Sequence, residues 1–288
     1  MAVFALIAIF LLIIYALIWL KASKDYQPFI GGFQKDEFSL HFMAPVSLYL
    51  LDRFKIIERF YGRISMIQQK IMKLHGHKEA IPYTKMFVAQ LISVVLIGFL
   101  ATCLMAYIGN GDQLLFIAGI AMTAFMPAFM IKRLSDKEKK RNDAIVMELP
   151  ELLNKMILLV NAGETVQLAL IRCVGSKEDS NHPLYNHLRE VVNKLTNNES
   201  FPLVMNNLSK SCGIQEVSIF STTVLLNYRK GGQDLVLSLR ELSQDLWRKR
   251  KAISKSKGEE ASSKLVFPLV LIFLAVLIIV GWPAMQMM

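Results

Sequence analysis

Long apolar segments alternate with strongly polar ones along this chain. Four segments contain no Lys, Arg, Asp or Glu: Ala2–Leu20, Met86–Ile108, Leu114–Ile131 and Leu265–Met285. An α-helix rises about 1.5 Å per residue, so each segment has about the length needed to cross roughly 30 Å of membrane hydrocarbon. The pattern predicts an all-α, polytopic membrane protein with four transmembrane helices. They comprise one helix over 1–20, a hairpin over 86–131, and a last helix with a short outer tail over 265–288.

The basic residues predict how these helices are oriented. All 33 Lys and Arg residues lie in two blocks, 21–85 and 132–264. Loops rich in Lys and Arg stay cytoplasmic, so both blocks are expected inside the cell and both chain termini outside. Lys21 and Lys24 follow the first apolar segment, which favours a retained anchor over a cleaved signal peptide. The expected location is the inner (cytoplasmic) cell membrane, with too little chain outside for a surface receptor.

The first cytoplasmic block, 21–85, has one clearly amphipathic stretch. Residues 21–52 lack a strong period and are expected to form a linker, with one short helix after Pro45. Arg53–Leu74 is expected to be a helix, because its apolar residues recur at helical spacing. These residues are Phe54, Ile57, Tyr61, Ile64 and Ile71. Such a helix would lie on the membrane surface or pack against a larger domain.

The second cytoplasmic block, 132–264, predicts a helical bundle with short connections. Its apolar stripes are Leu149, Leu152, Leu153, Met156 and Val160; Val166, Ala169, Leu170, Cys173 and Val174; Leu184, Leu188, Val191 and Leu195; a short run over 201–210; Val217, Phe220 and Val224; and Leu235, Leu239, Leu242 and Leu246. Gly163 is expected to end the first helix in a left-handed conformation, and Gly231-Gly232 to precede the sixth. That sixth helix lacks Gly and Pro from Gln233 to Ser256. It is expected to run towards the membrane, as a lever or as a plain connector.

The net charge of +10 comes mainly from two clusters near predicted membrane boundaries. One is KRLSDKEKKR (132–141), and the other is RKRKAISKSK (248–257), which opens with Arg248, Lys249, Arg250 and Lys251. Contact with anionic lipid head groups is the commonest role of such clusters. Docking of an acidic protein partner is the second interpretation. Nucleic acid ranks third and is not expected as a partner.

The sequence carries no recognisable catalytic motif. It has no phosphate-binding or dinucleotide-binding glycine motif, no HExxH and no CxxC. His75-Gly76-His77 stands alone without further ligands. Glu148 and Glu151 flank Pro150 and could hold a cation, although solvated helix charges are commoner. We therefore predict no enzyme, no catalytic residue, no cofactor and no metal site.

Two functional classes other than a scaffold make predictions that the sequence can check. A transporter or channel subunit with a cytoplasmic regulatory helical domain is the alternative. It predicts ionisable residues inside the membrane segments, where Gln90 is the main interior polar residue. A membrane-anchored signalling or enzymatic protein predicts a catalytic motif in 132–264, which is missing. A scaffold therefore agrees best with the residues.

Three stretches resemble one protein family. They are KEKKRNDAIVMELPELLNKMILLVNAGETVQLAL (137–170), Gly231-Gly232 with DLVLSLRELSQDLWRKRK (234–251), and SKLVFPLVLIFLAVLIIVGWPA (263–284). Their order of basic run, Leu-Pro, apolar helix, small-Gly turn and second helix resembles the type II secretion F family of inner-membrane platform proteins. The last stretch is more similar to the TadC branch of the tight-adherence (Tad) pilus system than to its TadB sibling. The resemblance covers most of 86–288, and residues 1–85 agree only in topology and length.

The resemblance implies a non-enzymatic platform with a cytoplasmic helical (F-type) domain. It implies that a cytoplasmic hexameric secretion ATPase and pilin subunits are partners. It also implies a homo- or hetero-oligomer, because larger relatives carry two copies of the domain and this chain has one, so a paralogous TadB-like platform protein would supply the second. Pro150, Gly163 and Gly232 match motif positions, and these three and Pro268 are expected to be architectural. Residues 248–251 are expected to contact the ATPase or anionic lipids.

Overall fold

The computed structural model describes residues 2–33, 41–76, 79–109, 112–177, 179–228 and 232–286. Within these ranges the chain consists of helices and the turns between them, without a strand, which confirms the all-α prediction. The helices divide into two compact units, Met1–Lys140 and Arg141–Met288.

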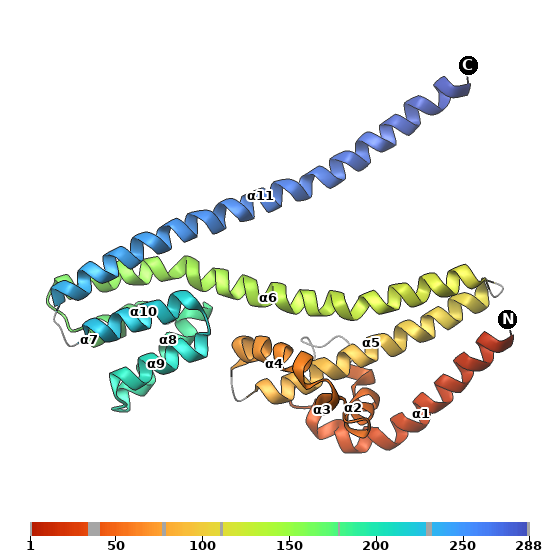
Figure 1. Ribbon diagram of the computed structural model, residues 1–288, viewed down its shortest axis with the longest axis horizontal. Helices are drawn as coiled ribbons and strands as arrows, with labels where there is room; N and C mark the ends of the chain where they lie inside the picture. Colours follow the sequence, from red (N-terminus) through yellow and green to blue (C-terminus); the bar gives the residue numbers. More distant parts are fainter. Residues whose placement is uncertain are drawn as a thin grey trace. The chain divides into compact units, whose positions relative to one another are not determined.

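The first unit is built around a small bundle of helices. It contains α1 (Ala2–Ile30), the 3₁₀ turn η1 (His41–Met43), α2 (Ala44–Arg53), α3 (Ile56–Arg59), α4 (Tyr61–His75), α5 (Ala80–Ile108) and the first part of α6 (Gln113–Asn161). Helix α2 packs against both α1 and α5 (Figure 1). Buried Ser93 of α5 donates a hydrogen bond to Ser47 of α2 at 2.9 Å. Helix α4 is joined to α6 by the Lys73 Nζ–Glu138 Oε1 pair at 2.8 Å.

Residues 21–30 are helical and not the linker that the sequence predicts. They continue α1 beyond the apolar segment, with Ala22 fully buried. The Tyr26 hydroxyl donates a hydrogen bond to Asp52 at 2.7 Å, and Ile30 packs against a cluster that contains Met86. Contacts with α2 and α5, which are distant in sequence, therefore stabilise a helix where local periodicity is weak. The short helix predicted near Pro45 is present as α2.

The single amphipathic helix predicted over Arg53–Leu74 is wrong. Lys55 has φ +47° in the left-handed region, which separates α2 from α3 and starts a new direction of the chain. Phe54 and Tyr61 are consequently exposed, not on a buried stripe. The remaining helix, α4, buries Ile64, Ile67 and Ile71 against α5 and α6.

Three helices in the described part of the chain are long and apolar enough to cross a membrane. They are Ala80–Ile108, Gln113–Asn161 and Gln233–Ile279. The first two contain the second and third predicted segments, and the last contains residues 265–279 of the fourth. The first predicted segment lies within α1, and its crossing stays a prediction, as does the orientation of all four segments. The apolar helices support a membrane protein because their exposed side chains are those of a lipid-facing surface.

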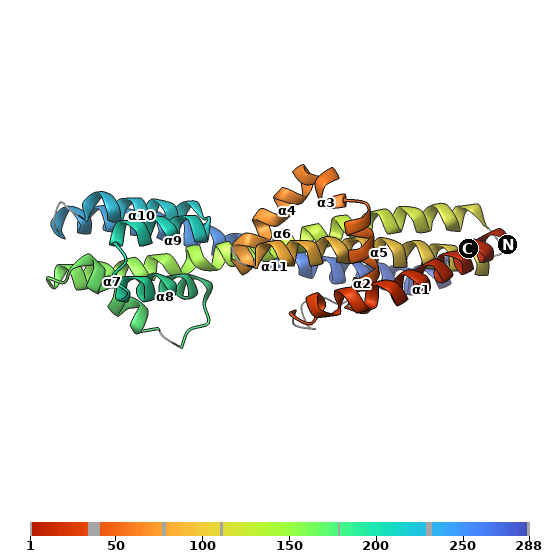
Figure 2. The same ribbon diagram turned by 90° about the horizontal axis from the view of Figure 1, so that it is seen from below.

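The second unit is a bundle around one apolar core. It contains the end of α6, α7 (Val166–Gly175), α8 (Pro183–Thr196), α9 (Phe201–Cys212), α10 (Gln215–Asn227) and α11 (Gly232–Gln286). Every stripe residue predicted for α6, α7, α8 and α10 is buried in this core, which confirms the helical spacing there. In α11 Leu235, Leu239 and Leu246 are buried and Leu242 packs against them. Helix α9 lies beside α10 (Figures 1 and 2).

Two helices of the second unit are longer than the bundle needs. The predicted third membrane segment and first bundle helix are one continuous helix, α6, which passes through Pro127 and Pro150. Helix α11 likewise runs without interruption for 55 residues, from the bundle into the last apolar segment. The continuation predicted for the sixth bundle helix is therefore confirmed.

Candidate partner-binding surface

The core face of α11 anchors this helix in the bundle. Leu239 and Leu246 are buried in the core, and the hydroxyl of Ser243, also buried, donates a hydrogen bond to Asn154 Oδ1 of α6 at 2.8 Å. Lys257 Nζ lies 3.9 Å from Asp143 of α6. Beyond Lys257 every residue described up to Ile279 has an exposed side chain. Helix α11 is therefore held by the bundle at one end and leaves it as an uncovered helix.

The opposite face of α11 is exposed and mixes apolar with basic residues. We call it the outer stripe of α11: Leu237, Arg240, Gln244, Arg248 and Lys251, which recur every three or four residues and are all exposed. Trp247 lies beside this stripe, and the Arg250 guanidinium sits 4.8 Å from its ring centroid, in cation–π geometry. Exposed Trp and Arg side chains are typical of protein-binding surfaces, so the stripe is a candidate docking face.

The four basic residues predicted to bind a partner do not share one surface. Arg248 and Lys251 lie on the outer stripe, where Arg248 makes an exposed pair with Asp245 at 3.5 Å. Lys249 points to α10, where Nζ donates a hydrogen bond to Glu216 at 2.7 Å. Arg250 stacks on Trp247. The structure therefore leaves two of the four cations, Arg248 and Lys251, on the docking face.

The carboxylates beside Pro150 form an ion-pair cluster within the bundle. Lys177 Nζ lies 2.5 Å from Glu148 Oε1 and 3.3 Å from Glu151 Oε1. Lys177 donates a hydrogen bond to Glu148, which raises the pKa of Lys177, and it donates another to Glu151, which lowers the pKa of Glu151. Lys177 also lies 5.3 Å from the ring centroid of Tyr185, a buried side chain. Lys177, together with Lys155 at 3.5 Å from Glu151, thus offsets the charge of the two carboxylates that could have held a cation. The described residues contain no metal-binding group of three or more ligands.

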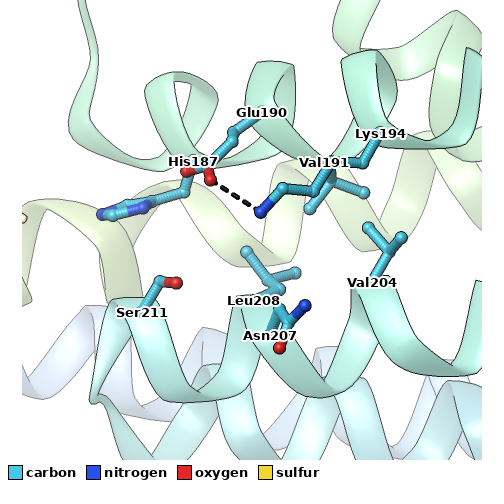
Figure 3. Close-up of a pocket in the computed structure, with 8 residues that line it drawn as sticks. All are labelled: His187, Glu190, Val191, Lys194, Val204, Asn207, Leu208 and Ser211. Carbon is cyan, nitrogen blue, oxygen red and sulfur yellow. Dashed lines mark hydrogen bonds and ion pairs between the residues drawn. The ribbon is translucent and has the colours of Figure 1, made fainter. Parts of the chain in front are cut away.

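A shallow groove lies between α8 and α9. Its lining residues are His187, Glu190, Val191, Lys194, Val204, Asn207, Leu208 and Ser211 (Figure 3). Glu190 and Lys194, one turn apart on α8, pair along one side of the groove at 2.7 Å. Arg141 of α6 approaches the groove wall, with Nη2 2.6 Å from His187 Nε2. Of its polar side chains, Glu190 and Lys194 pair with each other and His187 pairs with Arg141 of α6.

The predicted architectural residues occupy different structural settings. Gly163 has φ +95° and ends α6 with two hydrogen bonds, Gly163 N–H to Val160 O and Glu164 N–H to Leu159 O, the Schellman pattern. Pro150 is buried within α6, and Pro268 is exposed within α11. Gly232 is the first residue of α11; its neighbour Gly231 lies outside the described residues.

Sequence reasoning missed the residues that join helices through polar contacts. Arg141 lies in the basic run 132–141, where it reads as surface charge, and Lys177 and His187 belong to no motif. The only signal was their position, since each sits next to a buried stripe on an otherwise polar helix or turn. Their partners on other elements are 26 to 71 residues away in sequence, so spacing alone could not identify the pairs.

Comparison with known proteins finds a family match within the second unit. Residues 152–283 match the family model described as type II secretion system (T2SS), protein F. This match begins in α6, includes α7 to α10, and extends into the apolar part of α11. It supports the type II secretion F family that the sequence resembles. No curated protein and no solved structure matched the chain.

Proposed function

We propose that this chain is a non-enzymatic inner-membrane platform protein of a Tad or type IV pilus, or of a related type II secretion machine. The observation that carries the proposal is the family domain at residues 152–283, because proteins with this domain are generally non-catalytic platform proteins. The apolar helices that continue α6 and α11 agree with a place in the membrane. In this role the protein couples a cytoplasmic secretion ATPase to the extraction and assembly of pilin subunits.

The outer stripe of α11 is the proposed contact for the ATPase. Its exposed Leu237 and the neighbouring Trp247 supply apolar area, while Arg248 and Lys251 supply positive charge for an acidic partner surface. Lys249 is already paired with Glu216, so it stabilises the α10–α11 contact and is not part of the docking face. The basic run 248–257 within α11 also favours anionic lipids where the helix approaches the membrane.

The continuous α11 is the proposed path of coupling. Between Lys255 and Lys264 it carries two pairs at i,i+4 spacing, Lys255–Glu259 and Lys264–Glu260, which stabilise an uncovered helix. A displacement of the bundle end would then reach the apolar end through helical backbone. Pilin subunits have an apolar helix of their own and would meet the exposed apolar surface of the membrane segments. A TadB-like paralogue would complete the platform as a hetero-oligomer.

Photocrosslinking in the native membrane tests the proposal. A photoreactive amino acid replaces Trp247 beside the outer stripe or Gln167 on α7, and mass spectrometry identifies the captured protein. Exposed Asn193 on α8 is the control position. Capture of a secretion-type ATPase or of a second platform protein at the test positions supports the proposal. Capture of a solute-binding protein or of lipid alone contradicts it and favours the transporter alternative.

A matched pair of charge reversals tests the docking face itself. Lys251→Glu and Lys210→Glu each reverse one exposed lysine, the first on the outer stripe and the second on α9. We expect Lys251→Glu to lower the crosslinking yield at position 247 several-fold and Lys210→Glu to leave it unchanged. Equal effects of both variants would show that the charge of the whole domain matters and not this face.

A further inference from the structure

The turn between α2 and α4 exposes aromatic and basic side chains together. We call residues 53–63 the aromatic–basic segment; its sequence is RFKIIERFYGR. Phe54 is 64% exposed, Phe60 49% and Tyr61 68%. Four basic residues and one acidic residue give this segment a net charge of +3. The acidic residue, Glu58, pairs with Lys55 at 3.6 Å.

The arginines of the segment have no acidic partner among the described residues. They are Arg53, Arg59 and Arg63, and all three are exposed. The neighbouring carboxylate, Asp52, already accepts hydrogen bonds from Tyr26 at 2.7 Å and from Lys85 at 2.9 Å. The segment therefore presents uncompensated positive charge next to three exposed rings, and grouped exposed apolar surface marks a protein or membrane interaction site.

Contacts within the first unit place this segment beside the part of α5 where its apolar sequence begins. The opposite side of α3, Ile56 and Ile57, packs with Leu51 and Ile64 against Val88 and Ile92 of α5. Val88 and Ile92 lie two and six residues inside the apolar segment that begins at Met86, or about 3 and 9 Å along the helix. The aromatic–basic segment is thus fastened to the first turns of a membrane-spanning helix.

Contacts with α1 independently place the aromatic–basic segment at the same depth relative to the membrane. Phe42, at the start of the α2 region, has its ring centroid 5.9 Å from that of Trp19, next to the end of the apolar segment Ala2–Leu20. Ser47 of α2 meets Ser93, seven residues inside the apolar segment of α5. Both contacts put α2 and the following turn at the membrane boundary and not far out in the cytoplasm.

We propose that the aromatic–basic segment is a membrane-surface anchor that inserts Phe54, Phe60 and Tyr61 among the head groups of an anionic bilayer. Aromatic rings are most favourable at this depth, where the ring is partly in apolar surroundings. Arg53, Arg59 and Arg63 pair with lipid phosphates, whose charge is opposite to theirs. Because α3 is packed on α5, the anchor fixes the depth of the α5–α6 hairpin in the membrane. This role depends on the membrane level of α5 and not on which partner the second unit binds.

Spin labelling of the full chain in lipid vesicles tests the anchor. Cys103, Cys173 and Cys212 are replaced by Ala, and one label is attached through Phe60→Cys. Leu226→Cys, on exposed α10, is the water reference, and Val95→Cys, on α5, is the bilayer reference. The ratio of oxygen to nickel-chelate accessibility reports the depth of each label. In phosphatidylcholine vesicles containing phosphatidylglycerol, we expect the ratio at position 60 to lie between the two references.

Charge variants separate the basic from the aromatic contribution. Arg53→Gln/Arg59→Gln/Arg63→Gln is expected to shift the ratio at position 60 towards the water reference, as is removal of phosphatidylglycerol. Lys137→Gln/Lys139→Gln/Lys140→Gln removes the same charge from exposed positions of α6 and is expected to leave the ratio unchanged. An unshifted value at Val95→Cys shows that each variant is still folded and inserted.

Two results would overturn the anchor. A label at position 60 that is as accessible to the nickel chelate as Leu226→Cys would show that the segment faces water and is free for a protein partner. Immersion that is the same without phosphatidylglycerol and without the arginines would show that head-group phosphates do not hold it.

Discussion

At the scale of single residues, Gly163 shows how one backbone conformation ends a 49-residue helix. Its φ of +95° lies in the left-handed region, where a side chain meets the neighbouring backbone, and nothing else would contact an added Cβ. The loss of stability on replacing Gly163 therefore comes from backbone strain alone. The sequence predicts this turn, because Gly after an apolar stripe is the usual helix terminator.

We expect Gly163→Ala to destabilise the chain by about 1 kcal/mol, because alanine is strained in the left-handed region. Thermal unfolding of the purified chain in detergent measures the change. Gly175→Ala is the matched control: Gly175 ends α7 without positive φ and also has open space around its Cβ position. An unchanged or slightly raised melting temperature is expected there. A similar loss at both positions would contradict a backbone origin.

The protonation of His187 should change the free energy of unfolding as the pH is varied. Its Nε2 accepts a hydrogen bond from the Arg141 guanidinium, which is always protonated, so the ring is neutral. Burial and then the Arg141 charge lower the pKa of His187 from the ordinary 6.5, while Glu190 acts weakly in the other direction. The unfolded chain therefore binds protons at higher pH than the folded one. This contribution to stability is complete above pH 6.5 and is lost as the pH falls below it.

The expected outcome is a lower free energy of unfolding at pH 5.5 than at pH 7.5, values chosen to lie about one unit on either side of the ordinary histidine pKa. His187→Gln keeps an acceptor for Arg141 and cannot be protonated, so it should reduce the pH dependence. The pKa of His182 is also lowered by burial, so some pH dependence of the unfolding free energy, in the same direction, remains in this variant. A variant with an undiminished slope would show that the Arg141–His187 contact does not titrate with folding.

At the scale of elements, α5 and α6 pack closely against each other at two similar Gly–Thr contacts. A Cβ on Gly98 would lie 2.7 Å from the Thr123 methyl, and a Cβ on Gly119 would lie 2.5 Å from the Thr102 methyl. Each threonine bonds the carbonyl of the glycine four residues before it, and the two hydroxyls are 3.3 Å apart. Small residues thus let the two helices approach closely, which stabilises pairs of helices in membranes.

Gly119→Ala is expected to destabilise this hairpin by about 1–3 kcal/mol through overpacking. Thr102→Ser removes the methyl that the new Cβ would meet and keeps the hydroxyl. The double variant Gly119→Ala/Thr102→Ser should therefore recover part of the loss, as measured by unfolding in a titration with sodium dodecyl sulfate. Additive losses in the double variant would mean that the two side chains do not meet.

The elements also show where sequence periodicity succeeds and where it fails. The bundle stripes on α6, α7, α8 and α10 were predicted correctly, because each helix turns one apolar face to a single core. The helix predicted over Arg53–Leu74 was wrong, since the left-handed turn at Lys55 has no glycine to signal it. Residues 21–30 were expected to be a linker, yet they are helical because α2 and α5 pack against them.

At the scale of the whole molecule, α11 is the element that gives the proposed function a mechanism. It is held in the bundle as far as Lys257, after which its described side chains are exposed as far as Ile279. Gly258 lies in this uncovered part, and a Cβ there would meet nothing within 4 Å. Coupling along the helix should then depend on its continuity and not on any particular side chain.

Two substitutions with opposite effects on helix continuity test this coupling. Ala261→Pro removes a backbone donor and should kink α11, at a cost of about 3 kcal/mol in helix stability, while Gly258→Ala should strengthen the helix by about 1 kcal/mol. We expect Ala261→Pro to abolish pilus or secretion assembly at normal protein levels in the membrane. Gly258→Ala should preserve assembly. Normal assembly with Ala261→Pro would exclude a continuous α11 as the path of coupling.

The amino-acid sequence alone determined the apolar segments, the buried stripes of the bundle and the turn at Gly163. These follow from local quantities: hydrophobicity summed over a helix length, spacing along one helix, and the backbone freedom of glycine. The tertiary structure decided which charges remain free. Lys249 and Glu148 look like accessible groups in the sequence, but Glu216 of α10 and Lys177 of the turn after α7 pair with them. It also decided that Phe54 and Tyr61 are exposed, because burial depends on the direction in which the chain leaves Lys55 and on what α5 already covers.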